Sequence, residues 1–303
     1  MRAVFVDANA TLGAVAQRLH RAEDMPLQVN IQPDITSDQL PALLGDAEIA
    51  IIDHTHLPTD IAKACKGLKH VVFLGTGARS YMNPEELAAI GIEVHIIKGY
   101  GDTAVAECAF ALMWTAAKGF ARMDRGMRAG NWLRSDGVQL TGKTVGLIGY
   151  GGIASEMARL CRGAGMKVQA WNRSPKTAEG VTFTDLDTVL ATSDVLSVHL
   201  LLNDETRGFL GADKLAKVKD GAILINTARG AVVDEAAMIA ALASGKLAHA
   251  GLDVFDVEPL PANHPLTQVE NVTLSAHSAF RTPEASDNLF EAALQHCRRI
   301  EGK

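Results

Sequence analysis

Short runs of β-branched and aliphatic residues alternate with stretches of helical hydrophobic spacing along the first hundred residues. The helical stretches lie near residues 11–22, 37–44, 58–65 and 84–90, and the expected strands between them are Val4–Val6, Val29–Ile31, Ile49–Ile52, Val71–Leu74 and Val94–Ile97. Alternation of this kind is typical of βαβ units built around a parallel sheet. The pattern therefore predicts a small α/β domain over residues 1–98.

A second series of strands is expected beyond residue 140. Its members are Thr144–Ile148, Val168–Trp171, Val195–His199, Ala222–Asn226, His249–Asp253 and Val272–Leu274. Helical spacing separates these strands too, which predicts a second doubly wound domain over residues 99–282. The tail from Pro283 repeats apolar residues at helical spacing, so residues 283–303 are expected to form a helix that packs back on the first domain.

A long helix is predicted near residues 103–129, between the two series of strands. Its sequence, AVAECAFALMWTAAKGFARM, is unusually apolar, so we expect it to be buried on several sides. A position between domains or at a subunit interface fits this composition. Because exposing so much apolar surface is costly, the helix also predicts a homodimer, the commonest closed assembly.

Composition narrows the class of protein. The chain has 303 residues, 48% of them hydrophobic, with 29 Lys+Arg against 35 Asp+Glu and a net charge of −6. No basic stripe stands out, so nucleic acid is not an expected partner. The apolar run Ala104–Ala117 is too short and contains Glu107, so no membrane span is expected. The first residues read as a strand rather than a signal peptide, which makes the cytoplasm the expected compartment.

Cysteine and histidine spacing gives no metal signature. Cys65, Cys108, Cys161 and Cys297 form no C-x-x-C pair and are interpreted as buried apolar residues. The only close histidine pair, His54-Thr-His56, has no third ligand nearby in the sequence. No metal site is therefore expected.

The sharpest local motif follows the strand Thr144–Ile148. It reads Gly149-x-Gly151-x-x-Ala154 and leads into a helical stretch. In this strand–loop–helix context, Gly149 permits the tight turn, Gly151 lets backbone N–H groups approach a pyrophosphate, and Ala154 keeps the helix close to the strand. The motif predicts a dinucleotide at the helix N-terminus, against the alternative of a glycine turn without a ligand.

The end of the next strand bears on which dinucleotide is bound. An NAD site places Asp or Glu about 20 residues beyond the glycines, to accept from the ribose 2′-hydroxyl. Here the segment is Asn172-Arg173-Ser174, which contains no carboxylate. Arg173 and Ser174 are suited to a 2′-phosphate, so NADP(H) is the predicted cofactor, with NAD(H) as the alternative.

Three further segments end later strands, where open α/β sheets bind ligands. They carry Arg229 in NTARG, Glu258 in GLDVFDVEP and His277 in SAHSA. An arginine can bind a carboxylate through two hydrogen bonds, a histidine can exchange a proton with a carbonyl oxygen, and a glutamate can hold the imidazole. Each residue alone is ordinary. Together, behind a dinucleotide loop, they predict ketone reduction.

The ordered set GYGGIA, NTARG, GLDVFDVEP and SAH resembles the D-isomer-specific 2-hydroxyacid dehydrogenases, and the resemblance covers essentially the whole chain. It implies two Rossmann-like domains, with the cofactor domain inserted into a split flavodoxin-like substrate domain, and a homodimer built around the inserted domain. It implies hydride transfer between NADP(H) and a small 2-oxo or 2-hydroxy acid. By matching positions, Arg229 binds substrate, Glu258 is the carboxylate partner and His277 is the acid/base.

The resemblance also implies wider binding sets. The substrate-binding set is Gly75, Thr76, Gly77, Ala78 and Arg79, together with Arg229 and His277. The cofactor-binding set is Thr103, Gly149, Tyr150, Gly151, Gly152, Ile153, Asn172, Arg173, Ser174, His199, Leu200, Thr206, Thr227, Ala228, Arg229, Asp253 and His277.

The chain departs from the family pattern where the substrate is read. The loop that often reads G-x-G-x-D in the family is Gly75-Thr-Gly77-Ala-Arg79 in this chain. Arg79 is an extra cation that could bind a phosphate, so a phosphorylated substrate remains an alternative. Glyoxylate or hydroxypyruvate reduction is the preferred prediction. The alternatives are activity like that of D-3-phosphoglycerate dehydrogenase, or a non-catalytic dinucleotide sensor on the same fold.

Overall fold

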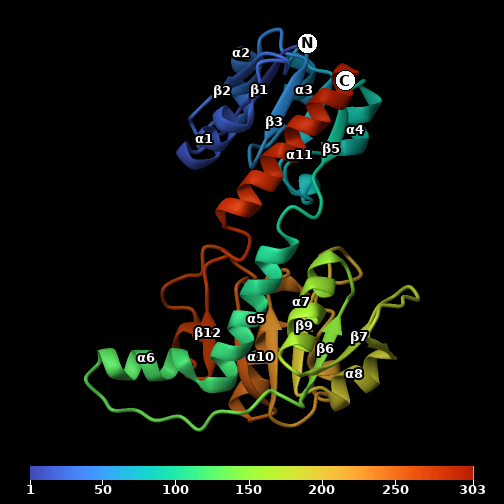
Figure 1. The fold of residues 1–303 in the computed structure, drawn as a ribbon. Coiled ribbons are helices and arrows are strands. Elements are labelled where there is room, and N and C mark those ends of the chain that lie inside the picture. Colours follow the sequence, from blue (N-terminus) through green and yellow to red (C-terminus); the bar gives the residue numbers. More distant parts are fainter. Residues whose placement is uncertain (303) are drawn as a thin grey trace. The chain divides into compact units, whose positions relative to one another are not determined.

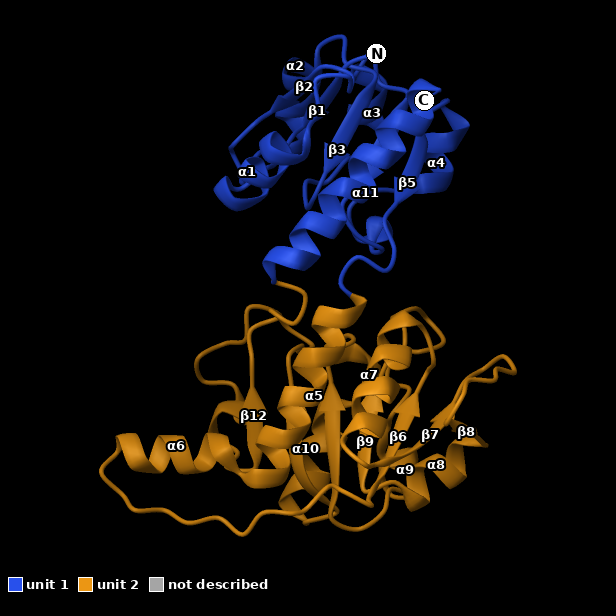
Figure 2. Cartoon of the chain, viewed as in Figure 1, with its two compact units in different colours: residues 1–101, 282–303 blue, residues 102–281 orange. Residues whose placement is uncertain are grey.

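The computed structural model describes residues 1–302, and the chain divides into two compact units (Figures 1 and 2). Unit 1 combines Met1–Gly101 with the segment that begins at Thr282, and unit 2 is Asp102–Arg281. Each unit is a parallel β-sheet covered by helices on both faces. The prediction of two doubly wound parallel sheets is confirmed.

Unit 1 contains a five-stranded sheet in the order β2-β1-β3-β4-β5. Its strands are β1 (Ala3–Phe5), β2 (Leu27–Val29), β3 (Ile49–Ile52), β4 (His70–Phe73) and β5 (Glu93–Ile96). Its helices are α1 (Ala10–Leu19), α2 (Leu40–Leu44), α3 (Thr59–Ala64), α4 (Pro84–Ala89) and α11 (Pro283–Glu301), with short 3₁₀ turns at Ser37–Gln39 and Ala78–Ser80. Helices α2, α3 and α4 bury their apolar residues in one core, and α1 and α11 bury theirs in the other.

One strand of unit 1 is misplaced by the sequence prediction. The prediction was Val29–Ile31, whereas β2 is Leu27–Val29. The chain leaves the sheet at Asn30, whose side chain donates a hydrogen bond to the Val6 carbonyl at 2.7 Å, and Ile31 is 52% exposed. Ile31 is apolar but lies beyond the paired part of β1. β-propensity reflects packing against neighbouring strands, and Ile31 has no neighbouring strand to pair with.

The histidine pair at 54 and 56 lies in a loop held by Asp7. The fully buried Asp7 carboxylate accepts hydrogen bonds from the backbone N–H groups of Asp53, His54 and Thr55. A hydrogen bond with Asp53, with the charge of Asp7 adding to it, raises the pKa of His54 to about 9. The imidazole is therefore protonated at neutral pH, and a metal would have to displace a proton in order to bind it.

Unit 2 contains a seven-stranded sheet in the order β12-β11-β10-β9-β6-β7-β8. Its strands are β6 (Thr144–Ile148), β7 (Lys167–Trp171), β8 (Thr182–Phe183), β9 (Val195–Val198), β10 (Ala222–Asn226), β11 (Leu247–Leu252) and β12 (Val272–Leu274). Its helices are α5 (Asp102–Lys118), α6 (Phe120–Arg128), α7 (Gly152–Gly163), α8 (Leu186–Thr192), α9 (Ala212–Leu215) and α10 (Glu235–Ala243), with 3₁₀ turns at Gly230–Val232 and Pro265–Gln268. Helices α5 and α7 cover one face, and α8, α9 and α10 the other.

The long helix predicted near 103–129 is in fact two helices. Gly119 separates α5 from α6 and adopts a left-handed conformation with φ of 66°. Only α5 is buried, against α7 and the strands β10 and β11, whereas α6 has no buried residue and extends away from the sheet (Figure 1). Within the single chain α6 is therefore not buried, and the expected burial at a subunit interface stays a prediction for it. The short edge strand β8 was not predicted, because two residues carry too little periodicity.

The order of strands in unit 2 reverses at β6, because β7 lies on one side of it and β9 on the other. Ligands of open α/β sheets bind at the carboxyl ends of the strands beside such a reversal. The loops that follow β6 and β9 therefore mark the expected ligand edge. No helix within residues 1–302 is both long enough and apolar enough to cross a membrane.

Candidate active site

The glycine loop lies at the strand reversal of unit 2. Gly149 has φ of +88°, and its N–H donates to the Trp171 carbonyl at 2.9 Å. A Cβ atom at Gly149 would lie 2.8 Å from the His199 carbonyl oxygen, so only glycine lets the end of β6 approach the end of β9 this closely.

Gly151 caps the N-terminus of α7 and faces open space. A Cβ atom there would meet no protein atom within 4 Å, and the first turn of α7 has no acidic residue. The protein itself therefore does not require glycine at this position, whereas a ligand approaching the free N–H groups of α7 would. Gly152 and Ile153 form the first turn of the helix.

Asn172 ties the glycine loop to the end of β7. Its side-chain oxygen accepts from the Tyr150 N–H at 3.0 Å, and its amide donates to the Ser174 carbonyl at 2.8 Å. The neighbouring Arg173 is 77% exposed and forms a 2.6 Å ion pair with Glu205. The predicted cofactor residues 172–174 are thus fixed beside the loop, with the guanidinium held by a carboxylate that the sequence did not single out.

The loop after β9 carries three more residues of the predicted cofactor set. His199 contacts the Ser197 hydroxyl at 2.9 Å, and burial lowers its pKa to about 4, so its imidazole is neutral. Leu200 is half-buried beside Gly149, and the Thr206 hydroxyl donates to the Leu201 carbonyl at 2.5 Å. Thr103 lies exposed in the first turn of α5.

The turn after β10 presents Arg229. Asn226 is buried and shapes this turn, because its amide donates to the Arg229 carbonyl at 3.0 Å and its oxygen accepts from the Ala228 N–H at 3.0 Å. Arg229 is exposed and donates to the Ala228 carbonyl at 2.6 Å. Within the described residues no salt bridge joins Arg229 to a carboxylate, so its charge is available to an anionic ligand.

Thr227 carries an unpaired polar atom. The residue is 7% exposed, and its hydroxyl oxygen is buried with no hydrogen-bond partner among residues 1–302. An unsatisfied buried hydroxyl costs stability, and such exceptions in native structures call for an explanation. A ligand bound against this turn would supply the missing partner.

Gly230 brings the turn after β10 against the segment after β11. A Cβ atom at Gly230 would lie 1.9 Å from the Phe255 carbonyl carbon, which no side chain could tolerate. This contact places Arg229 next to the segment that leads to Glu258. The sequence motif NTARG therefore needs its glycine for packing as much as for the turn.

The loop that carries His277 is held by Asp253, which is fully buried. One oxygen of Asp253 accepts from the Ser275 hydroxyl at 2.6 Å and the Ser278 N–H at 3.0 Å, and the other accepts from the Ala279 N–H at 2.9 Å. His277 itself has φ of 48°, and within the described residues it is the only non-glycine with positive φ. That conformation costs about 1 kcal/mol or more, so the hydrogen bonds of Asp253 maintain a strained position for the imidazole.

Glu258 and His277 form a direct pair. The Nδ1 atom of His277 lies 2.6 Å from one carboxylate oxygen of Glu258, and the other oxygen accepts from the Phe255 N–H at 2.9 Å. Both side chains are about one-third exposed, at 37% and 33%. Glu258 thus holds the ring through Nδ1, an arrangement that keeps Nε2 for proton exchange, as a general acid/base requires.

The structure assembles the predicted residues of unit 2 at one sheet edge and keeps a separate set in unit 1. Gly75, Thr76, Gly77, Ala78 and Arg79 follow β4 at the carboxyl edge of the other sheet. Arg79 is 73% exposed and its guanidinium donates two hydrogen bonds to Glu85, one of them at 2.8 Å. Its charge is therefore already engaged within unit 1.

Sequence reasoning missed the residues that act through others. Asp253 belongs to the expected cofactor-binding set, which stays a prediction, and within the described residues its side-chain hydrogen bonds all come from the 275–279 loop. Asn226 and Glu205 were not singled out. An asparagine at a strand end that precedes a turn is a recognised signal for Asn226, whereas the 32-residue separation of Glu205 from Arg173 leaves no signal.

The unit 2 residues fit a dinucleotide. Gly151 offers an open cradle at a helix N-terminus, and Thr227 presents an unpaired buried hydroxyl. The acid/base pair and the free arginine lie at the ends of later strands of the same sheet. The set suits an anionic substrate that exchanges a proton beside a bound dinucleotide.

Comparison with known proteins agrees with this arrangement. Residues 110–279 match the family model described as "D-isomer specific 2-hydroxyacid dehydrogenase, NAD binding domain". The chain is 34% identical over 262 residues to a hydroxypyruvate reductase of Thermotoga maritima, covering 85% of this chain and 84% of that one. It is 36% identical over 270 residues to a D-3-phosphoglycerate dehydrogenase of Archaeoglobus fulgidus, covering 87% of this chain and about half (51%) of that relative's length.

A solved structure gives the same result for the whole fold. A glyoxylate reductase from Paecilomyes thermophila superposes with a TM-score of 0.87 at 29% identity, covering 100% of this chain and 96% of that one. The family match, the two parallel sheets and the assembled arginine, glutamate and histidine lead to one conclusion. The chain belongs to the D-isomer specific 2-hydroxyacid dehydrogenases, a family of NAD(P)-binding enzymes.

Proposed function

We propose that the protein reduces a small unphosphorylated 2-oxo acid, glyoxylate or hydroxypyruvate, with NADP(H) preferred over NAD(H), and forms the D-hydroxy acid where a stereocentre arises. The observation that carries this proposal is the 2.6 Å contact between His277 and Glu258, together with an Arg229 that forms no ion pair with a carboxylate of the described residues. A non-catalytic sensor of dinucleotides would have no use for a histidine held by a glutamate in a strained conformation. The assembled pair therefore favours the enzyme over the sensor.

Each residue has a distinct task in this proposal. The glycine loop and the N-terminus of α7 bind the pyrophosphate, and the Thr227 hydroxyl and Arg173 bind further polar groups of the dinucleotide. When bound, the nicotinamide supplies the hydride for reduction. Arg229 binds the substrate carboxylate. His277 donates a proton from Nε2 to the substrate oxygen while Glu258 stabilises the imidazolium.

The ion pair of Arg79 with Glu85 bears on whether the substrate is phosphorylated. A phosphorylated substrate needs a second anion site, and such sites recruit several donors. The only predicted cation for it, Arg79, is held by Glu85 on the following helix α4, whose carboxylate would repel a phosphate. The pair therefore supports an unphosphorylated substrate over 3-phosphoglycerate, although a phosphoglycerate dehydrogenase is among the relatives.

A panel of substrates tests this proposal. With NADPH, we expect glyoxylate or hydroxypyruvate to give a higher kcat/KM than bulkier 2-oxo acids, and 3-phosphoglycerate to be a poor substrate in the oxidative direction. The measurement is the initial rate of NADPH consumption or formation across the panel. Efficient 3-phosphoglycerate oxidation that Arg79→Ala alone abolishes would make Arg79 the phosphate ligand and overturn the choice of substrate.

Removal of the catalytic pair should affect chemistry in two distinct ways. His277→Ala should lower kcat about 100-fold or more, because the general acid is lost. Glu258→Gln removes the negative charge that lies 2.6 Å from Nδ1 of His277, so the pH profile of kcat/KM should differ from that of the wild type. The measurement is the pH profile of kcat/KM.

Unit 2 contains a matched control for both substitutions. His264 lies 3.0 Å from Glu235 and forms a second histidine–glutamate pair, made of residues outside the predicted site sets. His264→Asn and Glu235→Gln should leave kcat and the pH profile as in the wild type. If Glu258→Gln also leaves the profile unchanged, Glu258 does not support His277 as proposed.

Cofactor preference rests on a charge balance at the end of β7. The ion pair between Arg173 and Glu205 is exposed on both sides, so opening it costs at most about 1 kcal/mol. A phosphate that binds Arg173 gains charge-assisted hydrogen bonds that outweigh this cost. Glu205 repels the same phosphate. The two residues thus act in opposite directions on the preference for NADP(H).

Two substitutions should therefore shift the preference in opposite senses. Arg173→Ala should lower kcat/KM for NADPH relative to NADH by about 10-fold or more, because a charged hydrogen bond of about 1.5–3 kcal/mol is lost. Glu205→Gln should raise the same ratio. The control is Arg159→Ala, which breaks an exposed ion pair with Glu156 on α7 and should leave the ratio unchanged. A wild-type preference for NADH contradicts the assignment.

Assembly as a homodimer is supported by the apolar surface of unit 2. The segment formed by α6 and the loop after it exposes four large apolar side chains. Single exposed apolar residues are normal on a protein surface, whereas a group of them within one segment is typical of an interface. They are Phe120 at 55%, Met127 at 51%, Trp132 at 75% and Val138 at 45%. A second copy of the chain with twofold symmetry would cover them.

Sedimentation tests the dimer. At micromolar concentration the wild type should sediment with the mass of two chains, and Trp132→Asp should shift the equilibrium toward one chain because it places a charge in the proposed interface. Leu201→Asp is the matched control, since Leu201 is 77% exposed but lies outside the α6 segment. A wild type that sediments as a single chain refutes the dimer.

A further inference from the structure

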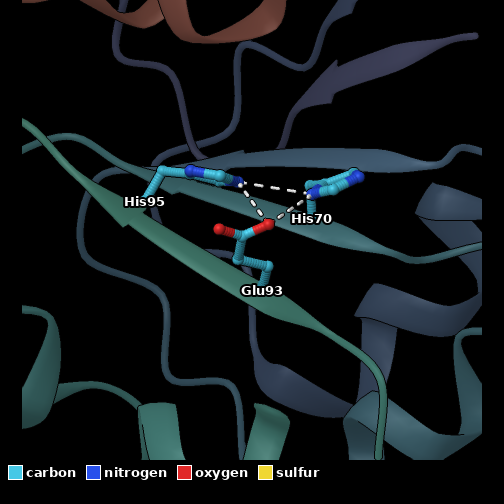
Figure 3. Close-up of side chains that lie close together, drawn as sticks. All are labelled: His70, Glu93 and His95. Carbon is cyan, nitrogen blue, oxygen red and sulfur yellow. Dashed lines mark hydrogen bonds and ion pairs between the residues drawn. The ribbon is translucent and has the colours of Figure 1, made fainter. Parts of the chain in front are cut away.

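Three side chains of unit 1 that the catalytic proposal does not use converge at the edge of its sheet. His70 is the first residue of β4, and Glu93 and His95 lie on the edge strand β5. His70 is the register partner of Glu93, and His95 follows Glu93 by two residues, so all three project from the same face of the sheet. Figure 3 shows the two imidazoles and the carboxylate directed toward one point.

The donor atoms are spaced as metal ligands are. His70 Nδ1 and His95 Nε2 lie 3.3 Å apart, and one oxygen of Glu93 lies 3.7 Å from each nitrogen (Figure 3). The point equidistant from these three atoms, in their plane, lies about 2.1 Å from each of them, which is the bond length that zinc makes to imidazole nitrogen and carboxylate oxygen. The described residues contain no other group of three or more histidine, cysteine, aspartate or glutamate side chains whose ligand atoms all lie within 4.8 Å of one another.

The two imidazoles face each other in a largely buried position. Their side chains are only 22% and 16% exposed. Neutral imidazole is the form that binds a metal. Without an ion, two ring nitrogens face each other and only one of them can carry the shared proton, so the other nitrogen has a lone pair directed into the cluster.

Helix α11 leaves room for the rest of a coordination shell. An open hollow of about 360 Å³ is lined by the three residues together with His296, Arg299 and Ile300 of α11. The ring centroids of His95 and His296 are 5.5 Å apart. The positive charge of Arg299 would repel a cation bound in this hollow, and the negative charge of the Glu93 carboxylate offsets this repulsion. Water from the hollow can fill the remaining position of a tetrahedral ion.

We propose that His70, Glu93 and His95 bind one divalent transition-metal ion of the zinc class per chain, with water in the fourth position. Two nitrogen ligands and one oxygen ligand select zinc, cobalt or nickel over magnesium and calcium, which prefer oxygen ligands alone. His70 and Glu93 begin their strands and His95 lies two residues further along β5, so the ion binds toward the amino end of β4, away from the Gly75–Arg79 loop that follows its carboxyl end. It joins β4 to the edge strand β5, independently of the proposed reaction.

Cobalt titration of the intact, chelator-treated protein tests the site. The wild type should bind one Co²⁺ per chain, with the visible absorption of a four-coordinate ion and without a thiolate charge-transfer band, and Zn²⁺ but not Mg²⁺ should displace it. His95→Asn and Glu93→Gln should each weaken Co²⁺ binding about tenfold or more, because each removes one ligand. Since Glu93 is 69% exposed, Glu93→Gln preserves the fold even if His95→Asn does not.

The control is His56→Asn, which removes an exposed histidine of the same unit and should leave binding unchanged. Binding that is equal in the wild type, His95→Asn and Glu93→Gln would overturn the proposal. So would binding that His56→Asn abolishes, a thiolate band, or displacement by Mg²⁺ as effective as by Zn²⁺.

Discussion

The buried carboxylate of Asp253 is the constraint on which the position of His277, the proposed acid/base, depends. It directly follows β11 and accepts hydrogen bonds from three groups of the loop that follows β12, so it joins two neighbouring strand ends through a side chain. A buried carboxylate is costly unless hydrogen-bonded, which makes the loop and the carboxylate mutually dependent. His277 can occupy its left-handed conformation only because this loop is fixed on either side of it.

Glycine completes the same construction by permitting close backbone approach. Gly230 lets the turn that bears Arg229 touch the segment between Asp253 and Glu258, and Gly149 lets the end of β6 touch the end of β9. The ligand edge of unit 2 is therefore compact where backbone meets backbone. It is open where Gly151 faces space at the start of α7. This contrast between glycines that pack and a glycine that does not is what distinguishes a binding loop from an ordinary turn.

Local periodicity was sufficient to predict the fold, because parallel strands buried on both faces read as continuous apolar runs. β10 is buried at all five positions and was predicted with its correct bounds. The prediction failed where the end of a helix or strand depended on a single residue or on residues distant in the sequence. Gly119 breaks the long helix, and Asn30 ends β2. The segment of α6 was expected to be buried because its apolar residues continue those of α5, although its own charged residues leave no side chain buried within the single chain.

The chemistry of the site was predictable to the extent that it follows strand ends. Arg229, Glu258 and His277 each stand shortly after a strand, and parallel strands end at one edge. The sequence does not predict contacts between residues that are far apart along the chain. Glu205 contacts Arg173, and His70 lies beside Glu93, only after the sheets form. Such contacts determine which arginines are neutralised by a carboxylate. Arg173 and Arg79 each hold a glutamate, whereas Arg229 donates only to its own turn. An anion that binds Arg229 therefore displaces no carboxylate, and this supports the proposal that Arg229 binds the substrate carboxylate.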